Sequence, residues 1–143
     1  MSEAALESLS ESECLDLLKT ARYGRVAVVT GDGRPEIFPV NFVLHERTVA
    51  FLTGSAVLQR WAPLGHVAFE ADQVDLATHE GWDVLVTGEG ADITDSVDTG
   101  SLMARHDRIE HWAPGHKDHW ISIVGARFSG RRLYTPAPSP DFF

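Results

Sequence analysis

The 143-residue sequence has a single cysteine, Cys14, and no long uninterrupted run of apolar residues. One cysteine cannot form a disulfide within the chain, and it excludes a zinc site built from several cysteines. No apolar stretch approaches the roughly 20 residues that a membrane-spanning helix needs. The first residues also lack the basic and apolar segments of a secretory signal. We therefore expect a cytoplasmic protein that does not act in a membrane.

Positive charge is scarce, because 12 lysines and arginines face 21 aspartates and glutamates, for a formal net charge of −9. Nucleic acids and anionic membranes bind to cationic faces, so neither is an expected partner. Hydrophobic residues make up 43% and charged residues 23%, as in an ordinary folded domain. The length predicts one domain, over residues 1–135, followed by a proline-rich C-terminal tail at residues 136–143.

A helix is predicted over residues 10–21. Ser10 and Glu13 have the spacing of a capping box, in which each side chain accepts from the other residue's backbone N–H. Behind them, Cys14, Leu17, Leu18 and Ala21 form one apolar stripe. Cys14 is therefore predicted to be a small core residue rather than a nucleophile.

The rest of the chain is predicted to be mostly β-strand. Strands are expected at residues 25–30, 36–44, 48–53, 66–74, 82–94 and 120–128, with residues 130–133 as a candidate extension of the last one. Gly31 and Gly33 predict a hairpin turn, Pro39 marks a bulge or an edge position, and Gly88 and Gly90 predict a sharp bend. Short helices are expected at residues 55–61 and 101–109. Hairpin connections of this kind favour a mainly β (α+β) fold, a six-stranded antiparallel barrel with peripheral helices.

An ordered set of sequence blocks resembles the pyridoxamine 5′-phosphate oxidase-like family of flavin-binding split barrels. The blocks are Leu9-Ser-Glu-Ser-Glu-Cys-Leu, Gly24-Arg-Val-Ala-Val-Val, Phe38-Pro-Val-Asn-Phe42, Val67-Ala-Phe-Glu-Ala-Asp72, Gly81-Trp-Asp-Val-Leu-Val-Thr-Gly88 and Trp112-Ala-Pro-Gly…His119-Trp-Ile-Ser-Ile123…Gly130-Arg-Arg. Their order and spacing fit from residue 9 to residue 133. The resemblance implies a six-stranded split barrel and a homodimer with cofactor sites at the subunit interface.

The resemblance also implies a cofactor, which is FMN, the deazaflavin F420 or, in some branches, haem. The leading expectation is an FMN-dependent oxidoreductase acting on a small molecule that the sequence does not identify. The segment Val40, Asn41 and Phe42 would run beside the flavin ring, and Trp82 and Trp120 would close the site. Asn41 offers both a hydrogen-bond donor and an acceptor. Alternatively, these residues form an ordinary strand with an edge proline.

The turn Thr53-Gly54-Ser55 is the candidate phosphate site, with Arg60 as the nearest cation. Hydroxyls, a glycine and the start of a helix suit an anion, although Ser55 could simply be a helix cap. Flavin-binding relatives usually place a lysine or arginine a few residues after this threonine, whereas this chain reads Ala56-Val-Leu-Gln. One missing charge-assisted contact costs about 1.5–3 kcal/mol, which is roughly ten- to a hundredfold in affinity. The competing hypothesis is therefore a haem-binding or cofactor-free interaction protein that has lost its affinity for flavin.

Four histidines lie close together in the sequence, at His106, His111, His116 and His119. Their spacing contains no pair on one helical face, so a surface or interface cluster is favoured over a metal site. An axial haem ligand among them is the sharper alternative. Trp112 is a further aromatic residue that could stack on a planar cofactor, although core packing is the simpler interpretation.

Overall fold

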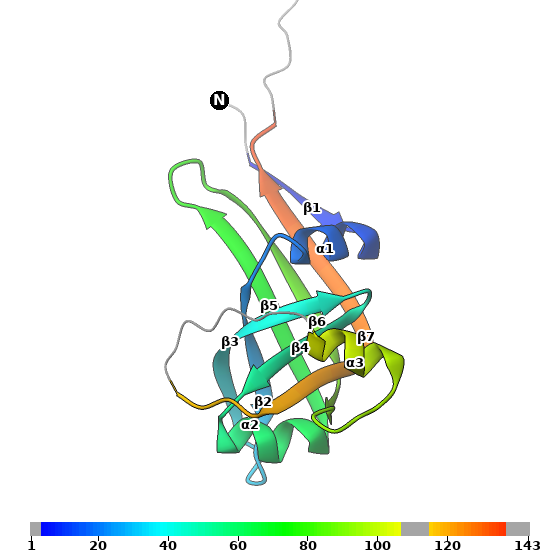
Figure 1. The fold of residues 1–143 in the computed structure, drawn as a ribbon. Coiled ribbons are helices and arrows are strands. Elements are labelled where there is room, and N and C mark those ends of the chain that lie inside the picture. Colours follow the sequence, from blue (N-terminus) through cyan, green and yellow to red (C-terminus); the bar gives the residue numbers. More distant parts are fainter. Residues whose placement is uncertain (1–3, 107–114, 137–143) are drawn as a thin grey trace, which may run out of the picture.

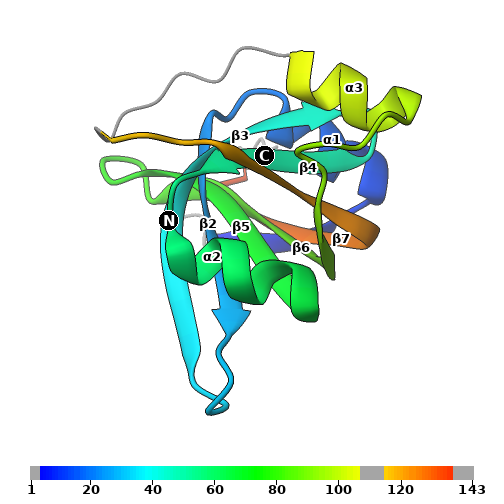
Figure 2. The ribbon, with the colours of Figure 1, turned by 60° about the horizontal axis from the view of Figure 1, so that its bottom comes forward.

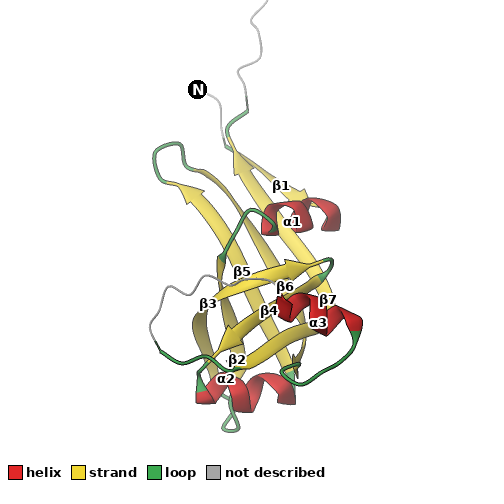
Figure 3. Ribbon diagram, viewed as in Figure 1, coloured by secondary structure: helices red, strands yellow, loops and turns green. Residues whose placement is uncertain are grey.

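The structure is a computed structural model that describes residues 4–106 and 115–136. These residues form seven strands, three α-helices and one short 3₁₀-helix (Figure 1; Figure 3). In chain order they are β1 (Ala5–Leu9), α1 (Glu11–Leu18), β2 (Tyr23–Val29), β3 (Pro35–His45), β4 (Thr48–Thr53), α2 (Ala56–Trp61), η1 (Ala62–Leu64), β5 (His66–Asp75), β6 (Glu80–Asp92), α3 (Thr99–His106) and β7 (His119–Tyr134).

Six antiparallel strands close into a barrel in the order β7-β4-β3-β2-β5-β6, because β6 pairs back onto β7. The predicted mainly β, six-stranded barrel is thereby confirmed. The glycine-based predictions also hold: Gly33 adopts a φ of +80° in the β2–β3 hairpin, and the β6–β7 register shifts between Thr87 and Glu89, at Gly88. Pro39 lies in a part of β3 that pairs with β2 on one side only, which is an edge position.

The structure differs from the sequence prediction at β1 and at the end of α1. Strand β1 was not predicted; it pairs with β7 alone, from Ala5 opposite Tyr134 to Leu9 opposite Gly130. Strand β7 includes the expected extension over residues 130–133, and this second half pairs with both β1 and β6. Helix α1 ends at Leu18 rather than at residue 21, although its capping box between Ser10 and Glu13 is present.

The barrel interior is filled by side chains that alternate along the strands, as a closed sheet requires. Phe42, Phe51 and Phe69 are its large aromatic residues, and the rings of Phe42 and Phe69 meet edge to face at a centroid distance of 4.8 Å. Cys14 is fully buried in this core. Burial raises the pKa of its thiol, which confirms the predicted structural role.

The helices cover the barrel unevenly. Helix α2 and the 3₁₀-helix lie at one end of the barrel (Figures 1 and 2). Helix α1 packs against β7, β1 and β6, and α3 packs against β3 and β4. Beneath α3, a second small core joins Ala104 to Ala50 and Ile93, with Val43 and Trp120 packed against it. None of the helices in the described parts of the chain is long and apolar enough to cross a membrane.

Candidate cofactor site

The predicted phosphate turn lies at the end of β4, where the chain enters α2. Thr53 is buried, and its Oγ1 accepts a hydrogen bond from the backbone N–H of Ser55 at 3.0 Å. Ser55 caps α2, with its Oγ accepting from the N–H of Leu58 at 3.3 Å. Both hydroxyls therefore hold the turn together, and the helix-cap role of Ser55 is present.

Gly54 is required by a close approach of another segment. A Cβ at this position would lie 1.9 Å from the carbonyl oxygen of His116, which leaves no room for any side chain. The backbone N–H of Asp118 donates to the carbonyl of Thr53 at 3.3 Å, so the residues before β7 cross directly over the turn. This segment brings its own polar side chains to the site.

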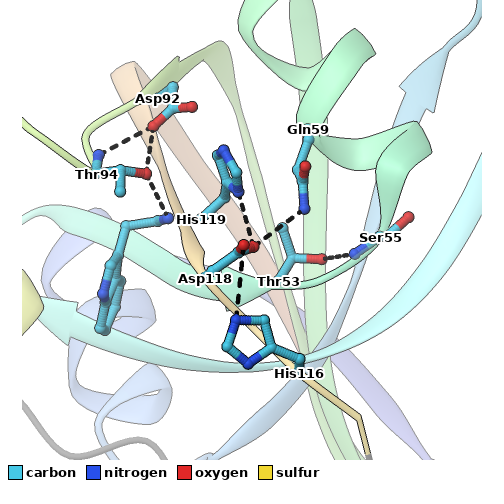
Figure 4. Close-up of polar contacts among 9 residues, drawn as sticks. Thr53, Ser55, Gln59, Asp92, Thr94, His116, Asp118 and His119 are labelled. Carbon is cyan, nitrogen blue, oxygen red and sulfur yellow. Dashed lines mark hydrogen bonds and ion pairs between the residues drawn. The ribbon is translucent and has the colours of Figure 1, made fainter.

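Asp118 is the centre of the polar cluster that results (Figure 4). One carboxylate oxygen lies 2.8 Å from His119 Nδ1 and accepts from Gln59 Nε2 at 3.5 Å, and the other lies 3.7 Å from His116 Nε2. The hydrogen bond with Asp118 raises the pKa of His119 and lowers that of the Asp118 carboxyl. The turn thus faces a carboxylate that two histidines neutralise when they are protonated.

The first half of β3 has an open edge beside this turn. β3 pairs with β4 only from Phe42 to His45, and between Pro35 and Asn41 no described strand pairs with the edge of β3 that faces away from β2. Some backbone N–H and C=O groups there point away from β2 and can meet a ligand. This gap between β3 and the end of β4 is where the barrel is split.

Two predicted site residues meet on the outer face of the sheet at this gap. On β4, Leu52 is paired with Trp120 of β7. Because the preceding residue of β4, Phe51, is paired with Phe42 of β3, the residue of β3 nearest to Leu52 is Asn41. The side chain of Asn41 donates from Nδ2 to the carbonyl of Arg22 at 3.2 Å. Asn41, Leu52 and Trp120 therefore lie in one row across three strands.

Val40 and Phe42 point the other way. Both side chains are buried in the barrel core. The backbone N–H of Phe42 donates to the carbonyl of Arg22 at 3.2 Å, so neither residue presents its side chain to a ligand on the outer face, whereas the Asn41 side chain between them faces outward.

The structure does not bring Arg60 and Trp82 into this group. The Arg60 guanidinium lies over the ring of Trp61, 4.8 Å from its centroid. Trp82 donates from its indole nitrogen to Gln73 and is paired with Arg132 on β7, whereas Thr53 is paired with His119 at the other end of that strand. At 3.3 Å per residue, those two positions on β7 are roughly 40 Å apart. Trp82 can belong to this site only if a second copy supplies it.

The predicted histidine cluster is divided. His116 and His119 flank Asp118, and His106 is exposed at the end of α3. His111 and Trp112 lie outside the described residues. Among the residues that are described, no group of three or more histidine, cysteine, aspartate or glutamate side chains is arranged to hold a metal ion.

Comparison with known proteins agrees with this geometry. The pyridoxamine 5′-phosphate oxidase family matches residues 10–132, which is most of the chain. This chain belongs to that family. The sequence is 30% identical over 139 residues to the uncharacterised Mycobacterium tuberculosis protein Rv0080, covering 92% of this chain and 88% of the relative.

Solved structures extend the family comparison to the fold. The FAD-binding protein from Mycobacterium smegmatis is 34% identical, with a TM-score of 0.71, and the match covers 90% of this chain and 99% of that one. An FAD-binding protein from Mesorhizobium loti, 20% identical over 89% of this chain and 97% of its own, has the same fold with a TM-score of 0.72.

Sequence reasoning missed the contribution of Asp118 and Gln59 to the polar cluster at this turn. These residues are 59 positions apart, and their contact depends on how the segment before β7 crosses the turn. The only available signal was Gly54, because a glycine directly after a strand can mark a close backbone approach as well as a flexible anion loop.

Proposed function

We propose that this chain binds a flavin nucleotide at the split between β3 and β4 and serves as a flavin-dependent oxidoreductase of the pyridoxamine 5′-phosphate oxidase-like type. The observation that carries the proposal is the open edge of β3 between Pro35 and Asn41, next to the Thr53–Ser55 turn. When bound, the flavin supplies two-electron transfer.

The chain's own residues would orient the ring and exclude water. The Phe42 N–H donates to the carbonyl of Arg22 on the β2 side, so the backbone groups of Asn41 point the other way and, with its amide, offer donors and acceptors to a heteroaromatic edge. Trp120, in the same row of the outer face, offers an aromatic wall. The titratable pair beside this row is His119, next to Trp120 in β7, and Asp118, which lie 2.8 Å apart.

The charges around the turn favour FAD as a second candidate besides FMN. FMN ends in a phosphate monoester that is close to a dianion at neutral pH, whereas each phosphate of FAD is a diester with one charge. Arg60 is stacked on Trp61, and the Asp118 carboxylate faces the turn. A turn with so little positive charge suits a diester better, and the 34% identical relative is an FAD-binding protein.

The alternatives are F420 and haem. F420 carries an acidic tail, which an acidic chain with net charge −9 would hold poorly. A haem-binding or cofactor-free interaction protein remains the alternative from a different class, supported by the absent cation after Thr53. Homodimerisation and a cytoplasmic location, expected from the sequence, are part of the proposal.

The test is a calorimetric titration of the purified protein with riboflavin, FMN and FAD, with F420 and haem in parallel. We expect micromolar or tighter binding of FMN or FAD and weaker binding of riboflavin, which lacks the phosphate. Binding of haem alone would replace the flavin proposal with the haem alternative. If none of the five ligands binds, the oxidoreductase proposal fails.

A restored cation sharpens the test. Leu58 is fully buried and Val57 packs against the core, whereas Ala56 is exposed at the start of α2. Ala56→Lys should tighten FMN binding by about tenfold through one charge-assisted contact and leave riboflavin binding unchanged. Ala77→Lys, in the exposed β5–β6 turn, is the control with the same added charge. Equal effects of the two variants would mean that the phosphate does not lie at this turn.

A further inference from the structure

Trp120 lies where β7 extends beyond the end of its neighbour β6. The last residue of β6 is Asp92, which pairs with Ile121, so β6 ends one residue short of Trp120. On its other side, Trp120 is paired with Leu52 of β4. The position of Trp120 therefore depends on the residues that the chain places beside it after leaving β6.

Both backbone polar groups of Trp120 are bound by the two residues that follow β6. The N–H of Trp120 donates to the hydroxyl of Thr94 at 3.0 Å, and its carbonyl accepts from the N–H of Ile93 at 2.8 Å. In an antiparallel strand the N–H and C=O of one residue point to the same side, so neither group of Trp120 points to β4. Removal of the Thr94 hydroxyl would take away the acceptor of a part-buried N–H, which costs free energy.

Asp92 fixes the direction of the Thr94 hydroxyl (Figure 4). The hydroxyl donates to a carboxylate oxygen of Asp92 at 2.5 Å, and the same oxygen accepts from the backbone N–H of Thr94 at 3.0 Å. An ionised carboxylate only accepts hydrogen bonds, so the hydroxyl proton points to Asp92 and a lone pair faces the N–H of Trp120. We name Asp92, Ile93 and Thr94 the β6 clamp.

The β6 clamp also connects Trp120 to helix α3. The carbonyl of Ile93 accepts from the guanidinium of Arg105 on α3, and its side chain belongs to the small core with Ala50 and Ala104. The Trp120 side chain packs against this core and remains partly exposed. Trp120 is thus held by the core through its ring and by the β6 clamp through its backbone, while part of the ring is left for a ligand.

We propose that the β6 clamp positions Trp120 as the aromatic wall of the flavin site, and that Thr94 acts on the flavin through Trp120. The inference rests on the flavin site proposed above. Aromatic rings stabilise one another only at a suitable offset or angle, so the wall must be held in place. The β6 ladder does not reach Trp120, and the Thr94 hydroxyl takes the place of the missing backbone carbonyl. Thr94 and Asp92 are therefore positioning residues.

The first arm of the experiment measures the β6 clamp in the full chain without flavin. Thr94→Val removes the acceptor of the Trp120 N–H at nearly constant volume, whereas Thr94→Ser keeps it. The backbone amide of Trp120 should exchange with solvent faster in Thr94→Val than in the wild type, and Thr94→Ser should behave as the wild type. Circular dichroism verifies the fold. Asp92→Ala, which leaves Thr94 in place, should act in the same direction and replaces Thr94→Val if that variant does not fold.

The second arm titrates the same variants with FMN and with FAD and records the fluorescence of the bound flavin. Trp120→Leu should weaken flavin binding by about three- to tenfold through the lost aromatic contact, and the emission should rise because an indole beside a flavin quenches it. Thr94→Val should change both quantities in the same direction, and Thr94→Ser should restore them. In the Trp120→Leu background, Thr94→Val should have no further effect, because it acts only through the indole.

Thr78→Val is the matched control. The Thr78 hydroxyl also accepts a backbone N–H, from Glu80 at 3.3 Å, but it lies in the exposed β5–β6 turn, so flavin binding should not change. Equal weakening by Thr94→Val with and without Trp120 would mean a general loss of structure and overturns the proposal. Flavin binding that is indifferent to Thr94→Val or to Trp120→Leu overturns the positioning role and leaves the proposed function intact. A wild type that binds neither FMN nor FAD overturns both.

Discussion

Two outer faces of the same barrel carry similar residues but meet different surroundings. Ala50 on β4 faces outward and is completely buried, because Ala104 of α3 and Ile93, which directly follows β6, pack over it. Ala68 on β5 also faces outward, and it borders an open groove. In both places small outward residues prepare the sheet for close packing. On one face the chain supplies the covering element itself, and on the other no described helix covers the sheet.

The first prediction tests the covered face with Ala50→Arg. An arginine there must displace α3 or bury its charge without a partner, so the free energy of unfolding should fall by at least about 3 kcal/mol. Urea denaturation followed by circular dichroism measures the loss. A loss below about 1 kcal/mol would show that α3 does not pack firmly on β4.

The second prediction concerns the turn that the segment before β7 covers. Gly54→Ala places a Cβ where the His116 carbonyl oxygen lies, so the backbone must shift, at about 1–3 kcal/mol of unfolding free energy. Gly65→Ala is the control, because Gly65 has extended backbone with no atom within 4 Å of its added Cβ. The two variants should differ clearly in urea midpoint, and equal midpoints would contradict the close approach.

The third prediction places the same substitution on the open face. Ala68→Arg should change the stability of the single subunit by less than about 1 kcal/mol, because no described side chain covers that position from outside. Urea denaturation followed by circular dichroism compares this variant with Ala50→Arg. Loss of folding comparable to that of Ala50→Arg would remove the distinction between the two faces.

The smallest expected effect concerns His119 and Asp118, which belong to the covering segment. The pKa of His119 is raised above its ordinary 6.5 in the folded protein. Its contribution to the free energy of unfolding is therefore complete below pH 6.5 and is lost as the pH rises through the folded pKa. The pKa of Asp118 is lowered below 3.8, so its contribution is lost as pH falls through the folded pKa. The pair therefore stabilises the fold most between pH 3.8 and 6.5.

His119→Gln should lower the urea midpoint slightly at pH 5 and leave it unchanged at pH 9. Both groups are exposed, so solvent screens the pair and the difference is small. His106→Gln, at the exposed end of α3, should change neither midpoint. A larger loss at pH 9 than at pH 5 would contradict the assigned direction of the pKa shift.

The sequence predicted the local features of this fold because local physics determines them. The capping box of α1, the hairpin at Gly33 and the strand alternation follow from residues close together in the chain. The strand β1 was missed because five residues with one partner strand carry too weak a pattern. The place of the predicted site residues in the fold was only partly predictable. The Arg60 guanidinium packs on the ring of its neighbour Trp61, and Asp118, which is far from the turn in sequence, contacts Gln59 through the fold.

The contrast between the two faces was not predictable from sequence at all. Ala50 and Ala68 both stand in a Val-Ala-Phe segment of a strand, and α3 lies beside Ala50 alone. A sequence pattern gives the side of a strand that faces the core, but what covers the opposite side depends on tertiary packing.

The long strand β7 has a consequence for the synthesis of the protein. It pairs with β6 along nearly its whole length, with β4 at its start and with β1 at its end, and it is the last strand described in the chain. Until residues 119–134 have left the ribosome, β4 and β6 are both open edges on one nascent sheet, and β1 has no strand to join. The barrel therefore closes in a single late step, which leaves the growing chain exposed to edge-to-edge association until its final strand arrives.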